Sequence, residues 1–195
     1  MSLPYALVLH GLGGSGPTHW QNWLAGELAH RGGQVDLPQF TLPDEPRLHV
    51  WLAELREHLA AAPTAGERVV VAHSLACLLW LHHAAGEFDP ALRVDRVLLV
   101  APVSPEFTDD PLITEFLGVP LDPAAVRRAG ASTRLVVGEG DPYCTVPQAK
   151  ELAEALRLDL DVIPGGAHLN VAADYGPWNA VLKWVRSDRT PLTPR

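Results

Sequence analysis

Short apolar runs rich in β-branched residues recur along the chain and alternate with segments of helical periodicity. Such runs are typical of strands buried on both faces, and these occur in parallel sheets covered by helices on each side. We therefore expect an α/β fold with three layers and a mostly parallel sheet of about six strands. The expected strands are Tyr5–His10, Gln34–Leu37, Arg68–Ala72, Val94–Val100, Thr133–Gly138 and Leu160–Ile163.

Apolar residues spaced three and four apart predict the helices between these strands. Their apolar faces contain Trp20, Trp23, Leu24 and Leu28, then Leu48, Trp51, Leu52, Leu55 and Leu59, and later Ala149, Leu152, Ala153 and Leu156. Thr18 and Gln21 have capping-box spacing and predict the start of the first helix. The stretch Leu75–Ala85 is apolar nearly all round, so we expect that helix to be buried.

One segment, Ala101–Ser132, interrupts this alternation with five prolines and a short helical patch near Leu112–Leu117. We interpret it as a loop excursion, too short to build a large cap. Residues 1–187 are expected to form a single domain, and residues 188–195 a frayed C-terminal tail.

Composition narrows the functional classes. The formal net charge of −8 argues against nucleic-acid and anionic-membrane partners. No signal peptide and no apolar run long enough to cross a membrane is recognised. The two cysteines, Cys77 and Cys144, imply no disulfide framework, so a reducing, cytoplasmic location is expected.

The strongest chemical signal is Ser74, which follows a buried apolar strand and precedes an apolar helix. A sharp strand-to-helix turn holds a serine hydroxyl clear of the backbone, as in the nucleophile elbow G-x-S-x-G. Here Ala72 and Ala76 occupy the two glycine positions. The competing interpretation is an ordinary serine N-cap.

Two further residues complete a possible catalytic triad. Asp141 and His168 each follow a predicted strand, and the chain order Ser, Asp, His is that of α/β-hydrolases. Residues beyond the carboxyl ends of parallel strands meet at one edge of the sheet. Ser74 is thus the predicted nucleophile, His168 the base and Asp141 the orienting acid. The competing acids are Glu139, Asp109 and Asp110.

A glycine-rich segment, His10–Gly16, directly follows the first predicted strand. Backbone N–H groups in such a loop stabilise the negative charge that develops on a carbonyl oxygen during acyl transfer. We predict an oxyanion hole from the N–H groups of Leu12 and Leu75, with Gly11 and Gly13 contacting the substrate.

The same segment also fits a dinucleotide-binding fingerprint, with Asp36 at the position of a ribose-binding acid. That fingerprint requires its helix to begin inside the motif. Pro17 and Thr18 predict a later start, so this interpretation is the weaker one.

The other histidines have no predicted role. His73 fills the variable elbow position, and His82 and His83 are expected to be exposed near a helix C-terminus. The histidines expected on other helical faces are His19, His30, His49 and His58. Neither H-E-x-x-H nor a paired C-x-x-C occurs, so no metal site or other cofactor is expected.

Several of these pieces together resemble the YdeN-like, retinoblastoma-binding-protein-nine family of small α/β serine hydrolases. The matching segments are His10–Trp23, the elbow at Ser74, Asp141–Cys144, Gly165–Asn170 and Gly176–Trp178. The resemblance spans nearly the whole chain and implies an α/β-hydrolase fold without a large cap. It also implies a triad at Ser74, Asp141 and His168 and an esterase-like activity.

The expected function is therefore hydrolysis of an acyl bond in a small substrate through an acyl-enzyme, without a cofactor. The alternative is a binding module that retains the scaffold with weak or no catalysis. Phe107 and Phe116 are expected to line a shallow acyl pocket, although they could equally pack the 101–132 loop onto the sheet.

Overall fold

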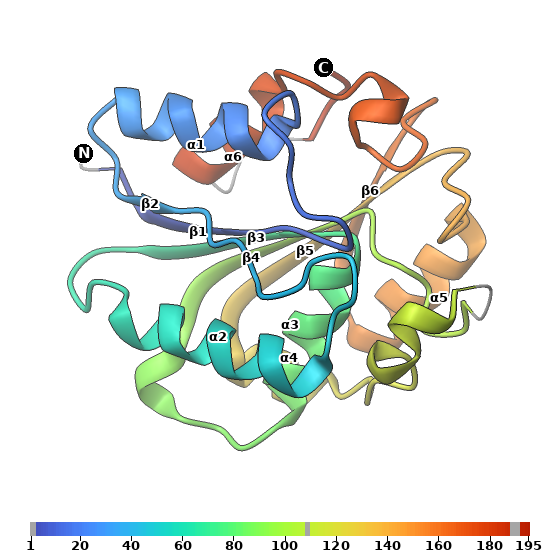
Figure 1. The fold of residues 1–195 in the computed structure, drawn as a ribbon, viewed down its shortest axis with the longest axis horizontal. Coiled ribbons are helices and arrows are strands. Elements are labelled where there is room, and N and C mark those ends of the chain that lie inside the picture. Colours follow the sequence, from blue (N-terminus) through green and yellow to red (C-terminus); the bar gives the residue numbers. More distant parts are fainter. Residues whose placement is uncertain (1–2, 108–109, 188–191) are drawn as a thin grey trace.

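The computed structural model describes residues 3–107, 110–187 and 192–195. Its centre is a parallel sheet of six strands in the order β2-β1-β3-β4-β5-β6 (Figure 1). The strands are β1 (Tyr5–Leu9), β2 (Val35–Asp36), β3 (Arg68–His73), β4 (Val94–Val100), β5 (Gly130–Gly138) and β6 (Asp159–Ile163). The α-helices are α1 (Trp20–His30), α2 (Leu48–Ala61), α3 (Leu75–Ala85), α4 (Pro123–Ala129), α5 (Val146–Leu156) and α6 (Asn179–Arg186).

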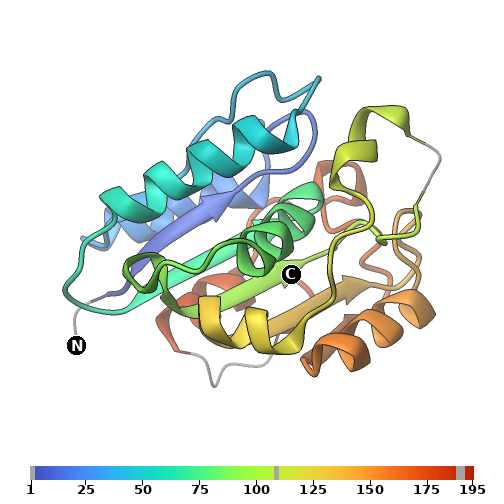
Figure 2. The same cartoon turned by 90° about the horizontal axis from the view of Figure 1, so that it is seen from below.

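Helices cover both faces of the sheet. Helices α1 and α6 lie on one face, and α2, α3, α4 and α5 lie on the other (Figures 1 and 2). Successive strand residues alternate between two hydrophobic clusters, as the pleat of a strand requires. Leu7 and Val70 belong to the cluster of α2 and α3, whereas Ala6 and Val69 belong to that of α1 and α6. The predicted three-layer α/β fold is confirmed.

Helix α3 is buried around most of its circumference, as its uniformly apolar sequence predicts. Helices α1, α2 and α5 coincide with the predicted apolar stripes. The start of α1 differs from the prediction, because its N-cap is His19 and not Thr18. The His19 side chain accepts a hydrogen bond from the N–H of Gln21.

Two helices were not predicted. Helix α4 lies within the 101–132 segment. The prolines of that segment led to its interpretation as a loop. Its signal was nevertheless present, because Asp122 caps it and Pro123 occupies its first turn. Helix α6 buries Trp184 and Val185 against the α1 face of the sheet.

The C-terminal segment is partly packed. Residues 188–191 lie outside the described part of the chain. Leu192 is buried among the residues of the α1 and α6 cluster, and the Nε1–H of Trp178 donates to the carbonyl oxygen of Thr193 at 2.7 Å. Leu192 and Thr193 thus contact the rest of the domain, and the boundary at residue 187 stays a prediction.

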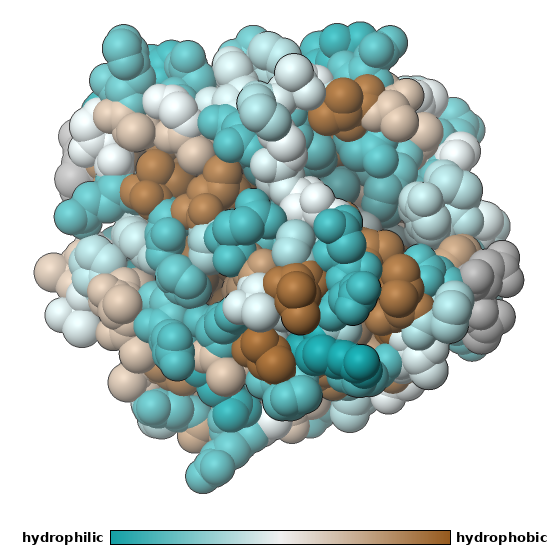
Figure 3. Space-filling model, viewed as in Figure 1, coloured by the Kyte–Doolittle hydropathy of each residue, from teal (hydrophilic) through white to brown (hydrophobic). Residues whose placement is uncertain are grey.

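Between β4 and β5 the described chain adds only the 3₁₀ segment η2 (Pro111–Phe116) and α4, so it contains no large cap domain. Hydrophobic residues on the face shown in Figure 3 form small separate groups among hydrophilic ones. None of the described helices is both long and apolar enough to cross a membrane.

Candidate active site

The predicted site residues gather at the carboxyl edge of the sheet. Ser74 directly follows β3, Asp141 lies three residues beyond β5, and His168 follows β6. The parallel register pairs Leu9 of β1 with Ala72 of β3, so the glycine-rich loop after β1 begins beside Ser74. This edge is where ligands bind in open parallel sheets.

Ser74 occupies a strained turn between β3 and α3. Its backbone angles are φ 57° and ψ −123°, a combination that costs a non-glycine residue about 1–3 kcal/mol. The turn is fixed by a hydrogen bond from the Ser74 N–H to the carbonyl oxygen of Val100, at 2.9 Å. Ala72 and Ala76 are fully buried on either side, so the elbow conformation accommodates alanine at both positions.

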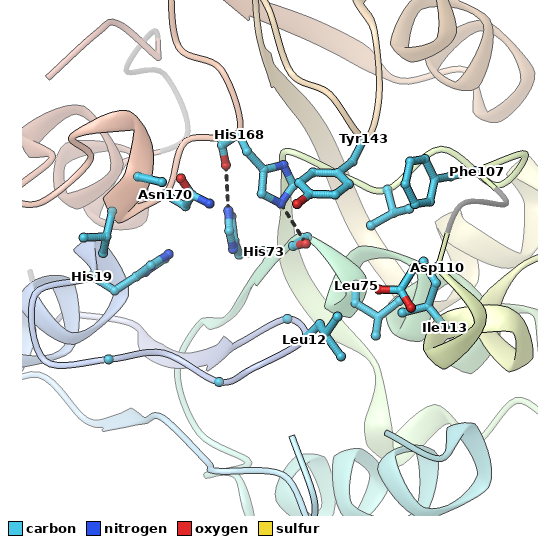
Figure 4. Close-up of a pocket in the computed structure, with 17 residues that line it drawn as sticks. Leu12, His19, His73, Leu75, Phe107, Asp110, Ile113, Tyr143, His168 and Asn170 are labelled. Atoms are coloured by element: carbon cyan, nitrogen blue, oxygen red, sulfur yellow. Dashed lines mark hydrogen bonds between the residues drawn. The ribbon is translucent and has the colours of Figure 1, made fainter. Parts of the chain in front are cut away.

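Ser74, His168 and Asp141 form a continuous hydrogen-bonded chain. Ser74 Oγ lies 2.9 Å from His168 Nε2 (Figure 4). On the other side of the ring, His168 Nδ1 lies 2.9 Å from Asp141 Oδ2. A carboxylate only accepts, so His168 carries its proton on Nδ1 and presents an unprotonated Nε2 to the serine hydroxyl. This is the arrangement that a general base needs.

The structure distinguishes Asp141 from the competing acids. Asp141 is 3% exposed, and its second oxygen, Oδ1, accepts the backbone N–H of Tyr143. Glu139 is exposed, and Asp110 instead caps η2 by accepting the N–H of Leu112. Asp109 lies outside the described residues. Only Asp141 therefore lies at hydrogen-bond distance from His168 among the described acids.

The loop that carries His168 is held from several sides. The residues on either side of it, Ala167 and Leu169, both have positive φ. The indole N–H of Trp20 donates to the carbonyl oxygen of Leu169 at 2.8 Å, and His73 Nε2 donates to that of His168 at 3.0 Å. Gly138 lets the loop approach β5, because a Cβ there would lie 2.1 Å from the carbonyl oxygen of Ala167.

The glycine-rich loop also approaches the elbow closely. A Cβ on Gly11 would lie 2.7 Å from the Cβ of Ser74 and 3.1 Å from the Leu75 nitrogen. His10, which is buried, anchors the start of this loop. Its Nδ1 donates to the carbonyl oxygen of Gly11, and its Nε2 accepts the N–H of Phe40. Burial lowers the pKa of His10 and so favours this neutral form.

The predicted oxyanion donors, Leu12 and Leu75, directly follow Gly11 and Ser74 on these two elements. Both residues line the cleft described below. Within the described chain, neither N–H makes a hydrogen bond. They are thus available to a ligand oxygen. The Gly13 N–H is not, because it donates to the carbonyl oxygen of Pro43 at 2.8 Å.

A cleft of about 330 Å³ opens over Ser74. Its apolar end contains Leu75, Val103, Phe107 and Ile113. Phe116, predicted to line an acyl pocket, is instead fully buried in the core against Trp51. Gly13, predicted to contact substrate, is likewise not among the lining residues, whereas Gly11 is.

Four polar or aromatic residues of the cleft were not predicted. They are His19, His73, Tyr143 and Asn170. The Tyr143 ring meets the His168 ring edge to face, with centroids 4.5 Å apart. Burial, followed by the nearby His168, lowers the pKa of His19 to about 4, and the same causes hold that of His73 well below its ordinary value. The sequence could have indicated two of these residues, because His73 directly precedes Ser74 and His19 directly precedes Trp20.

The structure also bears on the expected exposure of His83 and on the dinucleotide-binding interpretation of the glycine-rich segment. His83 is 7% exposed, so its expected exposure was wrong. Asp36 Oδ2 lies 2.6 Å from His58 Nδ1, and α1 begins four residues after Gly16. In this described segment no helix begins inside the motif, so the helix N-terminus that would bind a pyrophosphate is absent there. The described residues include no group of three or more His, Cys, Asp or Glu side chains placed to hold a metal ion.

The serine hydrolase family model matches residues 6–187. The chain belongs to the serine hydrolase family. A curated relative is the putative hydrolase YdeN of Bacillus subtilis (strain 168), which is 25% identical over 166 residues, 83% of each chain. The resemblance to YdeN-like small serine hydrolases is thereby confirmed.

Solved structures of the superfamily share this architecture. The B. subtilis ydeN product has a TM-score of 0.83 at 21% identity, covering 94% of this chain and 97% of that one. A YdeN-like hydrolase from Pectobacterium atrosepticum has a TM-score of 0.75 at 22% identity, covering 93% and 89%. Est1E from Butyrivibrio proteoclasticus, solved with ferulic acid bound, has a TM-score of 0.69 at 14% identity, covering 96% and 88%. The α/β-hydrolase fold is common to all of them.

Proposed function

We propose that this serine hydrolase cleaves carboxylic esters of small acyl groups, with Ser74 as nucleophile, His168 as general base and Asp141 as orienting acid. The observation that carries the proposal is the continuous chain from Ser74 Oγ through His168 to Asp141, with 2.9 Å at both junctions. The strained φ at Ser74 supports the same conclusion, because strain of this kind concentrates at functional sites.

Acylation begins when Ser74 Oγ attacks the ester carbonyl carbon and its proton passes to His168 Nε2. The carbonyl oxygen becomes an oxyanion, for which the free N–H groups of Leu12 and Leu75 are the donors. As the tetrahedral intermediate collapses, the bond from carbon to the alcohol oxygen breaks. His168 Nε2 gives its proton to that leaving alcohol, and the acyl group remains on Ser74.

Deacylation repeats the sequence with water. His168 takes a proton from a water molecule, whose oxygen attacks the acyl carbon, and the acid product leaves as Ser74 Oγ regains the proton. Asp141 stays ionised throughout and stabilises the imidazolium that forms in each half-reaction. The buried position of Asp141 strengthens that interaction, because its field is little screened by water.

The direct test is hydrolysis of p-nitrophenyl butyrate by the natural chain and by Ser74→Ala, with both proteins checked for folding by circular dichroism. We expect Ser74→Ala to lose activity by roughly a millionfold in kcat, to the background rate. Retention of a tenth of the activity would remove Ser74 from the mechanism. A folded natural chain that hydrolyses no ester would instead favour the binding-module alternative.

A further inference from the structure

The cleft over Ser74 has hydrogen-bonding side chains on one side of His168, where Val171 and Ala172 follow Asn170 in the lining, and a larger apolar group on the other. Figure 4 shows His19 and Asn170 on one side of the His168 ring, and Phe107 and Ile113 on the other. In the second, apolar end, Val103 and Ile113 are almost fully buried. Asp110, the acidic residue of that end, has Oδ1 engaged as the cap of η2.

At the polar end, His19 offers a neutral donor. Its Nδ1 accepts the N–H of Gln21 at 3.3 Å, so the proton of the neutral ring is on Nε2. The ring is 7% exposed and lines the cleft. Within the described chain Nε2 has no hydrogen-bond partner. The lowered pKa of His19 keeps this donor uncharged at neutral pH.

Asn170 supplies a second neutral donor at the same end. Its Oδ1 accepts the N–H of Ala173 at 3.1 Å, which assigns the amide nitrogen to the other side of the group. Among the described residues, that Nδ2 has no hydrogen-bond partner, and Asn170 lines the cleft. The described lining contains no lysine or arginine, so this end offers hydrogen bonds without positive charge.

We propose that the His19 and Asn170 end binds the alcohol part of the ester, and that this leaving group carries a neutral oxygen such as a hydroxyl. The inference rests on the proposed function and assigns the acyl chain to the apolar end, beside Phe107 and Ile113. A hydroxyl oxygen has lone pairs that these neutral donors can bind, whereas an alkyl leaving group would leave both donors unpaired on displacing water. His19 and Asn170 are then specificity-determining residues.

The experiment compares two butyrate esters of nearly equal size, 2-hydroxyethyl butyrate and propyl butyrate, and measures the ratio of their kcat/KM values. We expect the natural chain to prefer the hydroxyethyl ester by roughly tenfold, the worth of one to two hydrogen bonds. His19→Asn retains a capping side chain for α1 but is too short to replace the ring. It should lower the ratio severalfold, and so should Asn170→Ser, because each variant removes one of the two donors.

Controls separate specificity from damage. His30→Asn changes an exposed histidine at the other end of α1 and should leave the ratio unchanged. A folding defect lowers both rates and does not move their ratio. A second pair, propyl 3-hydroxybutyrate and propyl 3-methylbutyrate, places the hydroxyl on the acyl side. A preference in that pair that His19→Asn abolishes would overturn the assignment of the two ends.

The outcomes distinguish this inference from the function beneath it. Equal kcat/KM values for the two butyrates, with Ser74-dependent turnover, would overturn the inference and leave the proposed function standing. A hydroxyethyl preference that survives His19→Asn and Asn170→Ser would also overturn it. Absence of Ser74-dependent turnover of every ester would overturn the proposed function and the inference together.

Discussion

Gly11 lies so close to Ser74 that a Cβ on Gly11 would come within 2.7 Å of the Ser74 Cβ, a separation that neighbouring Cβ atoms do not adopt. The same Cβ would lie 3.1 Å from the Leu75 nitrogen. The absence of a side chain at Gly11 therefore allows the glycine-rich loop and the elbow to meet. Both proposed oxyanion donors, on Leu12 and Leu75, depend on that approach.

Gly11→Ala should therefore impair catalysis more than folding. The added methyl group must push the loop or the elbow outward, and displacements of about 1 Å at a catalytic centre cost roughly a hundredfold in rate. Gly16→Ala, in the same loop, is the matched control, because a Cβ there meets nothing within 4 Å. We expect kcat/KM to fall about a hundredfold only in Gly11→Ala; comparable activity of the two variants would contradict the role given to this contact.

Asp141→Asn should lower kcat by about ten-thousandfold, the loss found for the same change in a related triad. The amide can still accept the Tyr143 N–H, but its nitrogen would favour the wrong tautomer of His168. Glu139→Gln is the control, since that exposed side chain lies on the same loop. Steady-state kinetics with one ester measure kcat for both variants. A large loss of kcat in Glu139→Gln together with a small loss in Asp141→Asn would assign the triad acid to Glu139 instead.

The protein should prefer esters with short acyl chains. The apolar end belongs to a cleft of about 330 Å³, and the burial of Phe116 in the core removes one wall that a deeper pocket would need. Each methylene that is buried gains about 0.8 kcal/mol, roughly fourfold in kcat/KM, until the space is filled. We expect esters of roughly C2 to C6 acids to outperform C12 and longer ones. A p-nitrophenyl ester series below the micelle concentrations tests this; a steady rise to C12 would reveal a deep channel.

Stability should fall as the pH is lowered from 7 to 5. Burial first, and then the Arg56 charge, lowers the pKa of His83 from 6.5 to about 4, so the unfolded chain binds a proton there before the folded chain does. The stabilisation is complete above pH 6.5 and is lost as the pH falls toward 4. The slope from one such histidine reaches ~1.4 kcal/mol per pH unit.

Urea unfolding at pH 7 and pH 5 measures this effect. His83→Gln should show a smaller loss of unfolding free energy between the two pH values than the natural chain. His30→Gln, at an exposed position, should show the same loss as the natural chain. Equal losses in all three proteins would mean that His83 is readily protonated in the folded state.

Much of the fold was predictable because buried parallel strands and amphipathic helices have distinct periods. The observed β4 has the predicted bounds, and α3 coincides with its apolar run. Helix α4 was missed because the nearby prolines were interpreted as loop punctuation, although Pro123 sits in the first turn of that helix, where proline is favoured.

For the site, the order of Ser74, Asp141 and His168 along the chain was informative, because parallel strands bring residues beyond their ends to one edge. The position of His19 and His73 in the cleft was not visible in the sequence, since it depends on how the start of α1 and the end of β3 pack against the His168 loop. The hydrogen bond from the Trp20 indole to the Leu169 carbonyl oxygen joins residues 149 positions apart, and a local sequence pattern does not reveal a contact between such distant residues. Phe116 was expected in the acyl pocket but lies in the core, because the sequence does not distinguish an apolar side chain of the core from one of a pocket.

The nucleophile can be identified directly by labelling with an active-site-directed fluorophosphonate and locating the modified residue by peptide mass spectrometry. We predict rapid, stoichiometric modification of Ser74 in the natural chain, because His168 Nε2 at 2.9 Å activates its hydroxyl. Labelling should disappear in Ser74→Ala and slow strongly in a folded His168→Ala variant. An unlabelled natural chain, or a label on another residue, would contradict the assignment of Ser74 as the nucleophile.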